Sequence, residues 1–340
     1  MSNASITKND RTRRSSRIRN GVKLAGGAAF ALTLSLSSAG LAGADPISSP
    51  GMDRTTLSDS AQDEAVEYWT EERMEQATPA DELVEDKGAA PAEVERDAGS
   101  LLVPAVKPTD LPTSAGKKKD RPETQAQTGT DHIGKVFFTV GGNDYVCSGN
   151  SVASTNGSTV STAGHCTSSG GAWATNWVFA PGYDHGETPH GLWAATEIVS
   201  TSQWVNSEDI NYDVAFAKVQ SDTATGTLAE TVGASGIAFN EERGLEYSAY
   251  GYPAQSPFDG EGLEQCHGTA SDDTLGGTQS QGVDCDMTGG SSGGPWFIGG
   301  DASGYQNSVN SFGYKTQANV MYGPYFGDEA KQAYQEAEVA

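Results

Sequence analysis

The sequence has little positive charge, few cysteines and no long uninterrupted apolar run. Its 340 residues contain 21 Lys and Arg against 45 Asp and Glu, so the formal net charge is −24. This acidity argues against binding to nucleic acid or to an anionic membrane, because both need a basic surface. The hydrophobic share of 36% is too high for a wholly disordered chain, and the apolar residues are too interrupted for several membrane spans.

Cysteine occurs only four times, and neither a CxxC nor an HExxH motif is present. These absences argue against a zinc site, and we expect neither a metal nor another cofactor. In an exported chain, four cysteines indicate two disulfides, for which three pairings are possible. All four lie beyond residue 131, at Cys147, Cys166, Cys266 and Cys285.

The charged and apolar residues are unevenly distributed along the chain. Residues 1–44 contain seven bases and one acid, and an apolar, small-residue stretch ends in AGA at 42–44. This pattern predicts a secretory signal peptide, with a membrane anchor as the alternative. We therefore expect a secreted, extracellular protein that has no contact with a membrane once the signal is removed.

The next segment, residues 45–130, carries 19 acids, 9 bases and no cysteine. Within it, residues 61–76 are rich in helix formers and predict one amphipathic helix. A basic cluster at 117–121 (KKKDR) suits proteolytic removal. We interpret the segment as a propeptide followed by a linker, and the alternative is a disordered acidic spacer.

Residues 131–340 form the third segment, which holds all four cysteines and 25 acids against 5 bases. Short apolar runs alternate there with Gly, Asn, Ser and Asp turns, which predicts an all-β sandwich or barrel. The expected strands lie at 135–140, 145–146, 175–180, 214–219, 246–250, 296–298 and 320–322. Alanines among Lys, Gln and Glu at 328–340 predict a closing helix.

A glycine-rich motif at 289–295 (GGSSGGP) surrounds Ser292. Glycines let the backbone bend so that the hydroxyl projects into a cleft and nearby N–H groups point at one spot. Such N–H groups can hold the oxyanion that develops during acyl transfer. Taken alone, the motif also fits a surface loop.

A histidine and an aspartate complete this chemistry. His165, in 162–166 (TAGHC), follows a β-rich run and can act as a general base. Asp213 begins an alternating strand in 211–219 (NYDVAFAKV), where a buried carboxylate needs a donor such as an imidazole N–H. Asp209 is its main rival. Each motif alone fits a structural role, but together they supply a nucleophile, a base and an orienting carboxylate.

The order of these residues separates two scaffolds. The pattern Gly290-x-Ser292-x-Gly294 matches the nucleophile elbow of α/β-hydrolases, a fold that needs its histidine after its serine. No histidine follows His267, which excludes that scaffold. The other histidines are weaker candidates for the base: His132, His185, His190 and His267.

With these motifs in this order, the chain resembles the secreted bacterial serine proteases of the trypsin/chymotrypsin type. The histidine, aspartate and serine motifs of that family resemble residues 162–166, 211–219 and 289–296. Residues 146–152 (VCSGNSV) resemble the strand whose cysteine pairs with the one after the catalytic histidine. The resemblance covers residues 131–340.

This resemblance implies an all-β fold of two antiparallel six-stranded β-barrels with the cleft between them, here followed by a C-terminal helix. It implies Ser292 as nucleophile, His165 as general base and then acid, and Asp213 as the residue that orients the imidazole. The backbone N–H groups of Gly290 and Ser292 are implied as the oxyanion donors.

The same resemblance implies a disulfide between Cys147 and Cys166, which leaves Cys266 to pair with Cys285. It also implies a segment that pairs with the substrate backbone, and the corresponding residues are Ser311, Phe312 and Gly313.

Two positions depart from the trypsin type. That type keeps an Asp before the catalytic Ser, which pairs with a newly cut N-terminus, whereas Ser291 stands here. We therefore expect activation without this ion pair, and a propeptide that inhibits the enzyme or assists its folding. Counting back from Ser292 places Asp286 where trypsin-like enzymes accept a basic side chain; the alternative is a loop acid beside a disulfide.

The sequence therefore predicts a secreted serine endopeptidase, made as a zymogen, that acts as a monomer on protein or peptide substrates and interacts with its own propeptide. Two alternatives stay open. One is a non-catalytic binding module that kept the fold, and the other is an exported esterase on the same barrels.

Overall fold

The computed structural model describes residues 51–84, 99–108, 129–221 and 226–339. The predicted signal peptide at 1–44 and the basic cluster at 117–121 lie outside these residues. Within the described ranges, no helix is both long enough and apolar enough to cross a membrane.

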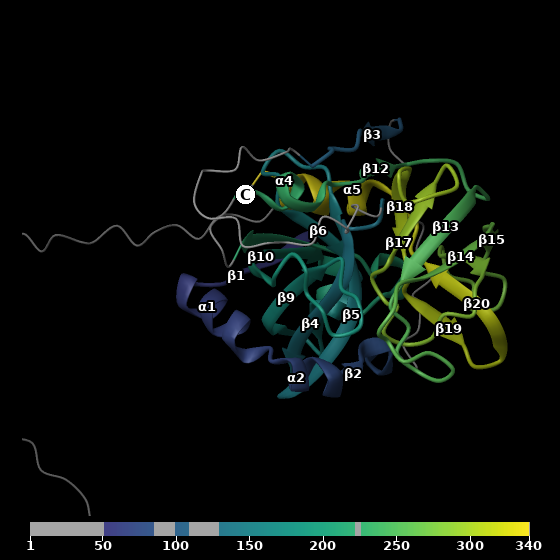
Figure 1. Cartoon of the computed structure of the whole chain (residues 1–340). Coiled ribbons are helices and arrows are strands. Elements are labelled where there is room, and N and C mark those ends of the chain that lie inside the picture. Colours follow the sequence, from purple (N-terminus) through teal and green to yellow (C-terminus); the bar gives the residue numbers. More distant parts are fainter. Residues whose placement is uncertain (1–50, 85–98, 109–128, 222–225, 340) are drawn as a thin grey trace, which may run out of the picture. The chain divides into compact units, whose positions relative to one another are not determined.

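Six antiparallel strands of the chain close into a barrel (Figure 1). They are β4 (Ile133–Val140), β5 (Asn143–Val152), β6 (Thr159–Thr162), β9 (Thr175–Pro181), β10 (Trp193–Thr201) and β11 (Ala215–Ser221). Their order around the barrel is β10-β11-β6-β5-β4-β9, and the pairing of β9 with β10 completes the circle. This confirms the first of the two β-barrels that the family resemblance implies.

Strand β4 shows why this barrel has little exposed surface along one side. All eight of its residues are buried, although alternate residues of a strand point to opposite faces. Val136 and Phe138 belong to the barrel interior. Phe137 faces outward and meets Trp69, whose ring centroid lies 5.3 Å away. The outer face is therefore covered by the segment that precedes the barrel in the sequence.

The remaining strands of the second half form curled sheets rather than one closed ladder. A six-stranded sheet has the order β14-β13-β17-β18-β12-β3, and a four-stranded sheet has the order β15-β16-β20-β19. The second barrel of the expected fold is thus divided between two sheets. Their strands are β3 (Leu101–Val103), β12 (Gly236–Phe239), β13 (Glu246–Gly251), β14 (Glu264–Thr269), β15 (Ser271–Asp272), β16 (Gln281–Asp284), β17 (Pro295–Ile298), β18 (Tyr305–Val309), β19 (Phe312–Tyr314) and β20 (Gln317–Gly323).

All seven strands expected from the sequence are present, as β4, β5, β9, β11, β13, β17 and β20, although β11 begins one residue later than the expected 214. The expected closing helix is α5 (Asp328–Ala337). The other short elements of this part are the hairpin β7 (Ser168–Ser169) and β8 (Ala172–Trp173), the helices α3 (Ser202–Ser207) and α4 (Leu228–Val232), and the 3₁₀ turns η2 (Gly164–Cys166) and η3 (Ile210–Tyr212).

The described parts of residues 45–130 form elements that pair with both β regions. They are β1 (Met52–Thr56), α1 (Asp59–Tyr68), α2 (Glu71–Gln76), β2 (Thr78–Pro79), η1 (Ala80–Leu83) and β3. Strand β1 pairs with β10, β2 pairs in parallel with β5, and β3 pairs with β12. These elements therefore add strands beside the barrel strands β10 and β5 and at the edge of the six-stranded sheet.

The prediction of one helix over 61–76 is wrong, because the structure divides that stretch into α1 and α2. The break falls at Trp69 and Thr70. The Trp69 ring is buried and its indole N–H donates to the carbonyl of Asn176 at 2.5 Å. The Thr70 hydroxyl accepts from the N–H of Arg73 and so caps the new helix. Tertiary packing of one aromatic ring thus overrides the local preference for a continuous helix.

Helix α5 closes one end of the barrel with an aromatic cluster. Tyr334 is fully buried, and its ring lies 5.7 Å from that of Phe216 and 5.3 Å from that of Phe239. Its hydroxyl donates to the carbonyl of Ala153 at 2.6 Å. The helix is therefore held by apolar burial and by one buried hydrogen bond.

Two substitutions at Tyr334 separate these contributions. Tyr334→Phe keeps the ring but leaves a buried carbonyl without its donor, so it should lower the free energy of unfolding by about 1 kcal/mol. Tyr334→Ala should cost about 3–5 kcal/mol, because it also leaves a cavity. Urea unfolding of both variants measures the difference, and equal losses would contradict this account.

Candidate active site

His165 lies in the turn η2, which follows β6 directly. The turn is tightly packed: a Cβ on Gly164 would lie 2.7 Å from the ring of Trp204 and 3.0 Å from Oδ1 of Asp213. Glycine at this position therefore lets the histidine turn approach the carboxylate. Packing of this turn against Trp204 fixes the backbone position from which the His165 side chain extends.

The imidazole of His165 is paired with Asp213, and both side chains are fully buried. Nδ1 lies 2.8 Å from Oδ2, and the backbone N–H of His165 donates to Oδ1 at 2.8 Å. A neutral imidazole held this way carries its proton on Nδ1 and presents a lone pair on Nε2. Nε2 is buried and forms no hydrogen bond with any residue in the described part of the chain.

Asp213 receives a third hydrogen bond, from the Ser311 hydroxyl to Oδ2 at 2.5 Å. These donors offset the loss of hydration that burial imposes on a carboxylate. The rival Asp209 instead caps η3 and accepts from the backbone and side chain of Asn211. Burial raises the pKa of Asp209, which is only partly offset by those hydrogen bonds. The structure thus brings Asp213, rather than Asp209, to the histidine.

The loop of Ser292 lies beside the histidine turn. The Ser292 carbonyl accepts from the N–H of Ser148 at 2.7 Å and lies 3.8 Å from Sγ of Cys166, the residue after His165. Gly293 has φ +81°, and a Cβ there would collide with the Thr162 hydroxyl. The glycine therefore permits the close contact between the two motifs.

The peptide groups around Ser292 are oriented by the partners of their carbonyls. The Gly289 carbonyl accepts from Ala254 N–H at 2.6 Å, and the Ser291 carbonyl accepts from the Asn310 amide at 2.9 Å. In a trans peptide the C=O and the following N–H point in opposite directions. The N–H groups of Gly290 and Ser292 consequently point away from these anchors, which is the arrangement an oxyanion site needs.

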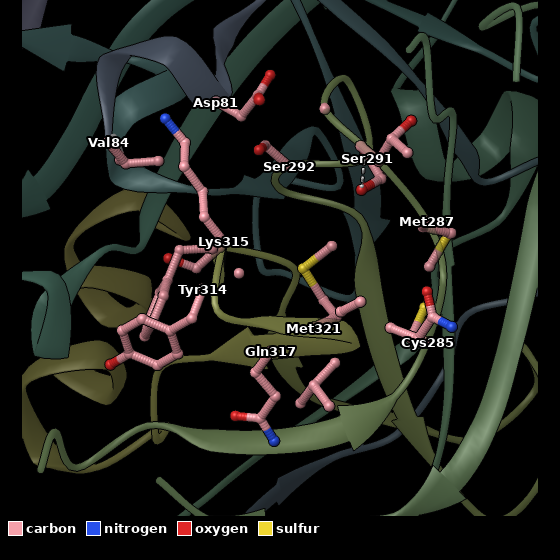
Figure 2. Close-up of a pocket in the computed structure, with 18 of the residues that line it drawn as sticks. Asp81, Val84, Cys285, Met287, Ser291, Ser292, Tyr314, Lys315, Gln317 and Met321 are labelled. Carbon is pink, nitrogen blue, oxygen red and sulfur yellow. Dashed lines mark hydrogen bonds between the residues drawn. The ribbon is translucent and has the colours of Figure 1, made fainter. Parts of the chain in front are cut away.

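A cavity of about 730 Å³ adjoins Ser292 (Figure 2). The predicted substrate-binding residues all line it: Asp286, Ser311, Phe312 and Gly313. The Asp286 side chain is exposed, whereas Met287 and Met321 of the same lining are buried. Phe312 stacks on Tyr322 with a centroid distance of 5.2 Å. Apolar and polar side chains therefore share the walls of the cavity.

Many of the lining residues were not found from the sequence, among them Asp81, Val84, Gln255 and Met321. The first two belong to the segment before the barrel, and Gln255 lies in the connection between β13 and β14. None of them stands in a motif, so only the three-dimensional structure reveals them.

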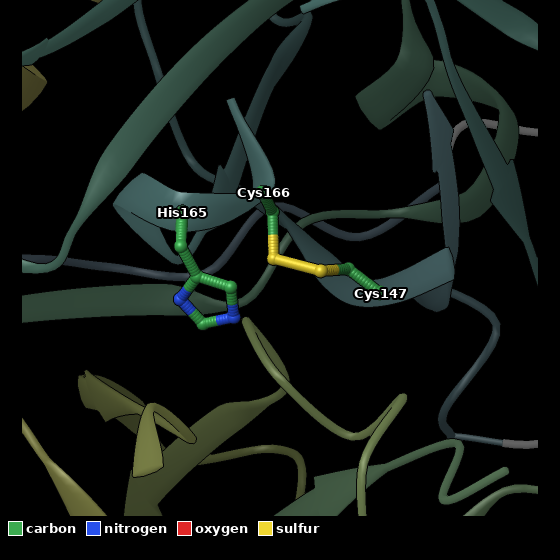
Figure 3. Close-up of side chains that lie close together, drawn as sticks. All are labelled: Cys147, His165 and Cys166. Carbon is green, nitrogen blue, oxygen red and sulfur yellow. A yellow bond between two sulfur atoms is a disulfide. The ribbon is translucent and has the colours of Figure 1, made fainter. Parts of the chain in front are cut away.

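Both expected disulfides are present, Cys147–Cys166 and Cys266–Cys285. Cys147, His165 and Cys166 are close enough to share an ion (Figure 3), but both sulfurs belong to the disulfide. No thiolate ligand remains in this group. The disulfide instead fixes the strand of Cys147 to the histidine turn.

The other histidines lie in different surroundings. The His267 side chain is half-exposed, and its Nε2 lies 2.8 Å from the Glu246 carboxylate. Nδ1 of His132 lies 2.6 Å from the Asn150 side chain. His185 is exposed beside Asp184. His190 lies 3.7 Å from Asp131. None of these four residues lines the cavity beside Ser292.

A closed β-barrel, a second curled β region and a buried His–Asp pair beside a glycine-flanked serine define a protease-like serine hydrolase. Comparison with protein-family models finds no match, and neither does comparison with curated proteins.

Two solved structures are close relatives. The thermostable serine protease AL20 from an extremophilic microorganism is 53% identical, with a TM-score of 0.60 over 62% of this chain and 98% of that protein. Protease Anisep from Arthrobacter nicotinovorans is 52% identical, with a TM-score of 0.61 over 62% of this chain and 97% of that protein. A Glu endopeptidase at 20% identity and a TM-score of 0.50 (62% of this chain, 92% of that protein) shares the fold alone. The chain belongs to the chymotrypsin-fold serine proteases.

Replacement of the two aspartates tests the pairing. Asp213→Asn should lower kcat about 10⁴-fold, because the amide favours the wrong imidazole tautomer and cannot stabilise an imidazolium. Asp209→Asn is the matched control and should leave kcat near the wild-type value. Hydrolysis of a peptide substrate by each processed variant gives the comparison, and a larger loss at Asp209 would reverse the assignment.

Proposed function

We propose that this chain is the precursor of a secreted serine endopeptidase, with residues 131–340 as the enzyme and residues 45–130 as its propeptide. One observation carries the catalytic assignment: the buried His165–Asp213 pair keeps Nε2 without a partner at the loop of Ser292. Identities of 53% and 52% to two serine proteases support the reaction class.

Acylation follows from this geometry. Nε2 of His165 takes the hydroxyl proton while Oγ of Ser292 attacks the carbonyl carbon of the substrate peptide. The negative charge passes to the carbonyl oxygen, where the N–H groups of Gly290 and Ser292 donate to it. Asp213 stabilises the imidazolium, which then protonates the leaving amine as the C–N bond breaks.

Deacylation repeats these steps with water. His165 takes a proton from water, the hydroxide attacks the ester carbon on Ser292, and the tetrahedral adduct uses the same two N–H donors. Nε2 returns the proton to Oγ as the ester bond breaks, which releases the acid product and restores the enzyme. In this structure Nε2 does not yet bond to Ser292, as is common before a substrate is bound.

Two observations support the division of the chain and its export. The close relatives match 62% of the chain, the share that residues 131–340 represent (210 of 340). Two disulfides require an oxidising compartment, which agrees with residues 1–44 acting as a secretory signal.

Chemical labelling tests the nucleophile. A fluorophosphonate should label the processed wild-type protein, while Ser292→Ala should lose the label and lower turnover by a factor on the order of 10⁶. Ser291→Ala is the control and should keep the label, because the Ser291 hydroxyl bonds to the Thr288 carbonyl. Hydrolysis of casein alongside a short-chain ester distinguishes the protease from an esterase, and ester cleavage alone would overturn the endopeptidase assignment.

The propeptide is proposed to inhibit the enzyme by filling its cleft. The turn η1 packs against η2, which bears His165. A Cβ on Gly289 would collide with the Asp81 carboxylate, so this carboxylate lies against the backbone beside the Gly290 N–H. Val84 packs in a small apolar cluster with Trp204 and Ile210. Figure 2 shows Asp81 and Ser292 at the same cavity, so the docked turn occupies part of the space beside the nucleophile.

No lysine or arginine in the described part of the chain forms an ion pair with the Asp81 carboxylate. Burial raises its pKa, partly offset by the charge of His165 and by hydrogen bonds, including one from Gln255 Nε2 at 3.1 Å. An acid whose pKa is raised on docking binds better when protonated. The docked state is therefore most stable in acid, and it loses stability as the pH rises through the pKa of Asp81.

Fluorophosphonate access to Ser292 in the uncleaved precursor tests this occlusion. The labelling rate relative to the processed enzyme should be low in acid and should increase as the pH rises through the raised pKa of Asp81. Asp81→Asn removes the buried charge, so it should slow labelling at pH 7 and flatten the pH dependence. Glu82→Gln is the control, because that neighbouring side chain is exposed. A precursor that is labelled as fast as the processed enzyme would show that the cleft is not occluded.

A further inference from the structure

A buried serine on the barrel contacts the loop that carries the proposed oxyanion donors. Ser148 is fully buried on β5. Its hydroxyl donates to the Gly290 carbonyl at 3.0 Å and accepts from the N–H of Tyr252 at 2.9 Å. Its backbone N–H donates to the Ser292 carbonyl at 2.7 Å. Ser148 therefore holds the carbonyls of both neighbours of Ser291, namely Gly290 and Ser292.

Glycine at position 290 makes this contact possible and also makes an anchor necessary. Its φ is +94°, and a Cβ would lie 2.8 Å from the Tyr252 carbonyl. A glycine can rotate freely between several backbone conformations, so its presence alone does not select the one that points N–H into the cleft. The hydrogen bond from Ser148 fixes the carbonyl of the peptide that joins Gly290 to Ser291, and this peptide lies between the two peptides that carry the donor N–H groups.

The segment 252–262, between β13 and β14, supplies the second anchor. Ala254 N–H donates to the Gly289 carbonyl at 2.6 Å. The Thr288 hydroxyl donates to the Gln255 carbonyl at 2.8 Å and accepts from the Gln255 N–H at 3.1 Å. The loop before Ser292 is therefore bonded along its length to this segment.

The segment 252–262 is in turn fastened to the barrel. Glu261 lies 3.5 Å from Nζ of Lys135 on β4 and accepts from the Tyr183 hydroxyl at 2.9 Å. The Lys135 side chain is only 3% exposed and its Nζ lies 4.1 Å above the Tyr183 ring. The Tyr252 hydroxyl donates to the Tyr183 carbonyl at 2.9 Å. A buried cation with these partners holds the segment in one place.

We propose that Ser148, together with the segment 252–262, is the positioning device that holds the oxyanion loop in its active conformation. This inference rests on the proposed function. It assigns to the barrel and to this segment the ordering that a newly cut N-terminus and an Asp give in the trypsin type, where this chain has Ser291. All of these contacts exist in the uncleaved chain, so cleavage has only to clear the cleft.

Kinetics of Ser148→Ala in the processed enzyme tests the role. Loss of the anchor frees the peptide between Gly290 and Ser291 and so loosens both neighbouring donor peptides. The kcat should therefore fall about 10- to 100-fold, less than the 10²–10³-fold cost of deleting a donor outright. KM should stay near the wild-type value, because the oxyanion forms only in the transition state. Affinity for a peptide trifluoromethyl ketone, which forms a tetrahedral adduct, should fall by the same factor as kcat/KM.

A matched buried serine separates this role from a general loss of stability. Ser308 on β18 is also buried, and its hydroxyl donates to the Pro324 carbonyl at 2.8 Å. Ser308→Ala removes a comparable hydrogen bond and should leave kcat and ketone affinity unchanged. A fall in kcat of the same size in both variants would overturn the proposal.

A second site keeps the test decisive if Ser148→Ala fails to fold. Thr288 is half-exposed, so its substitution is easier to tolerate. Thr288→Val removes the bonds to Gln255 and should lower kcat without raising KM, whereas Thr288→Ser keeps the hydroxyl and should restore kcat. Unchanged kcat in Ser148→Ala and Thr288→Val, with normal labelling of Ser292, would refute this inference alone; a wild-type enzyme that is not labelled would refute the proposed function.

Discussion

The site depends on one constraint, the burial of the Asp213 carboxylate without access to water. A buried anion is stable only when donors surround it, and here they come from the backbone and ring of His165 and from Ser311. His165 follows β6 of the barrel, whereas Ser311 precedes β19 in the other β region. The carboxylate therefore links the two β regions, and the same bonds that satisfy it set the tautomer and direction of the imidazole.

The oxyanion loop shows a second use of the same principle, with carbonyl groups in place of a carboxylate. Glycine at 290 gives that loop its shape but no rigidity, so the rigidity comes from donors on neighbouring elements. Ser148 holds the carbonyls of Gly290 and Ser292, while Ala254 holds that of Gly289 and Asn310 that of Ser291. The docked Asp81 lies against this backbone while all of these anchors are in place, so inhibition in the proposed precursor is a matter of occupancy. Catalysis and inhibition thus use a single local conformation.

The parts of the site that could be predicted from sequence are those with a local signature. TAGHC, NYDVAFAKV and GGSSGGPW each combine a reactive side chain with the small residues or alternation that position it, and the structure brings His165 and Asp213 together. Ser148 and Asp81 could not be found this way, because a serine in a strand and an acid in a charged segment are ordinary residues. Their partners lie at Gly290 and Gly289, more than 140 residues away. The break between α1 and α2 at Trp69 could not be predicted for the same reason, since the Trp69 indole bonds to the distant Asn176. The division of the second barrel into two sheets depends on pairings that strand patterns alone do not encode.

Strands β1 and β3 affect how long the proposed enzyme stays inhibited after its chain is cut. They add to β10 and to β12, so the described parts of the proposed propeptide, 51–84 and 99–108, are bound at two sheet edges as well as at the cleft. Cutting the chain converts this segment into a separate peptide but removes none of those hydrogen bonds. Its departure is then governed by mass action, and a bound peptide leaves only when its concentration falls below its dissociation constant. If the proposed precursor is secreted and cut as we propose, the protease would keep its bound propeptide near the cell and lose it in a large external volume. Dilution, rather than the cut itself, would then be the signal that starts proteolysis.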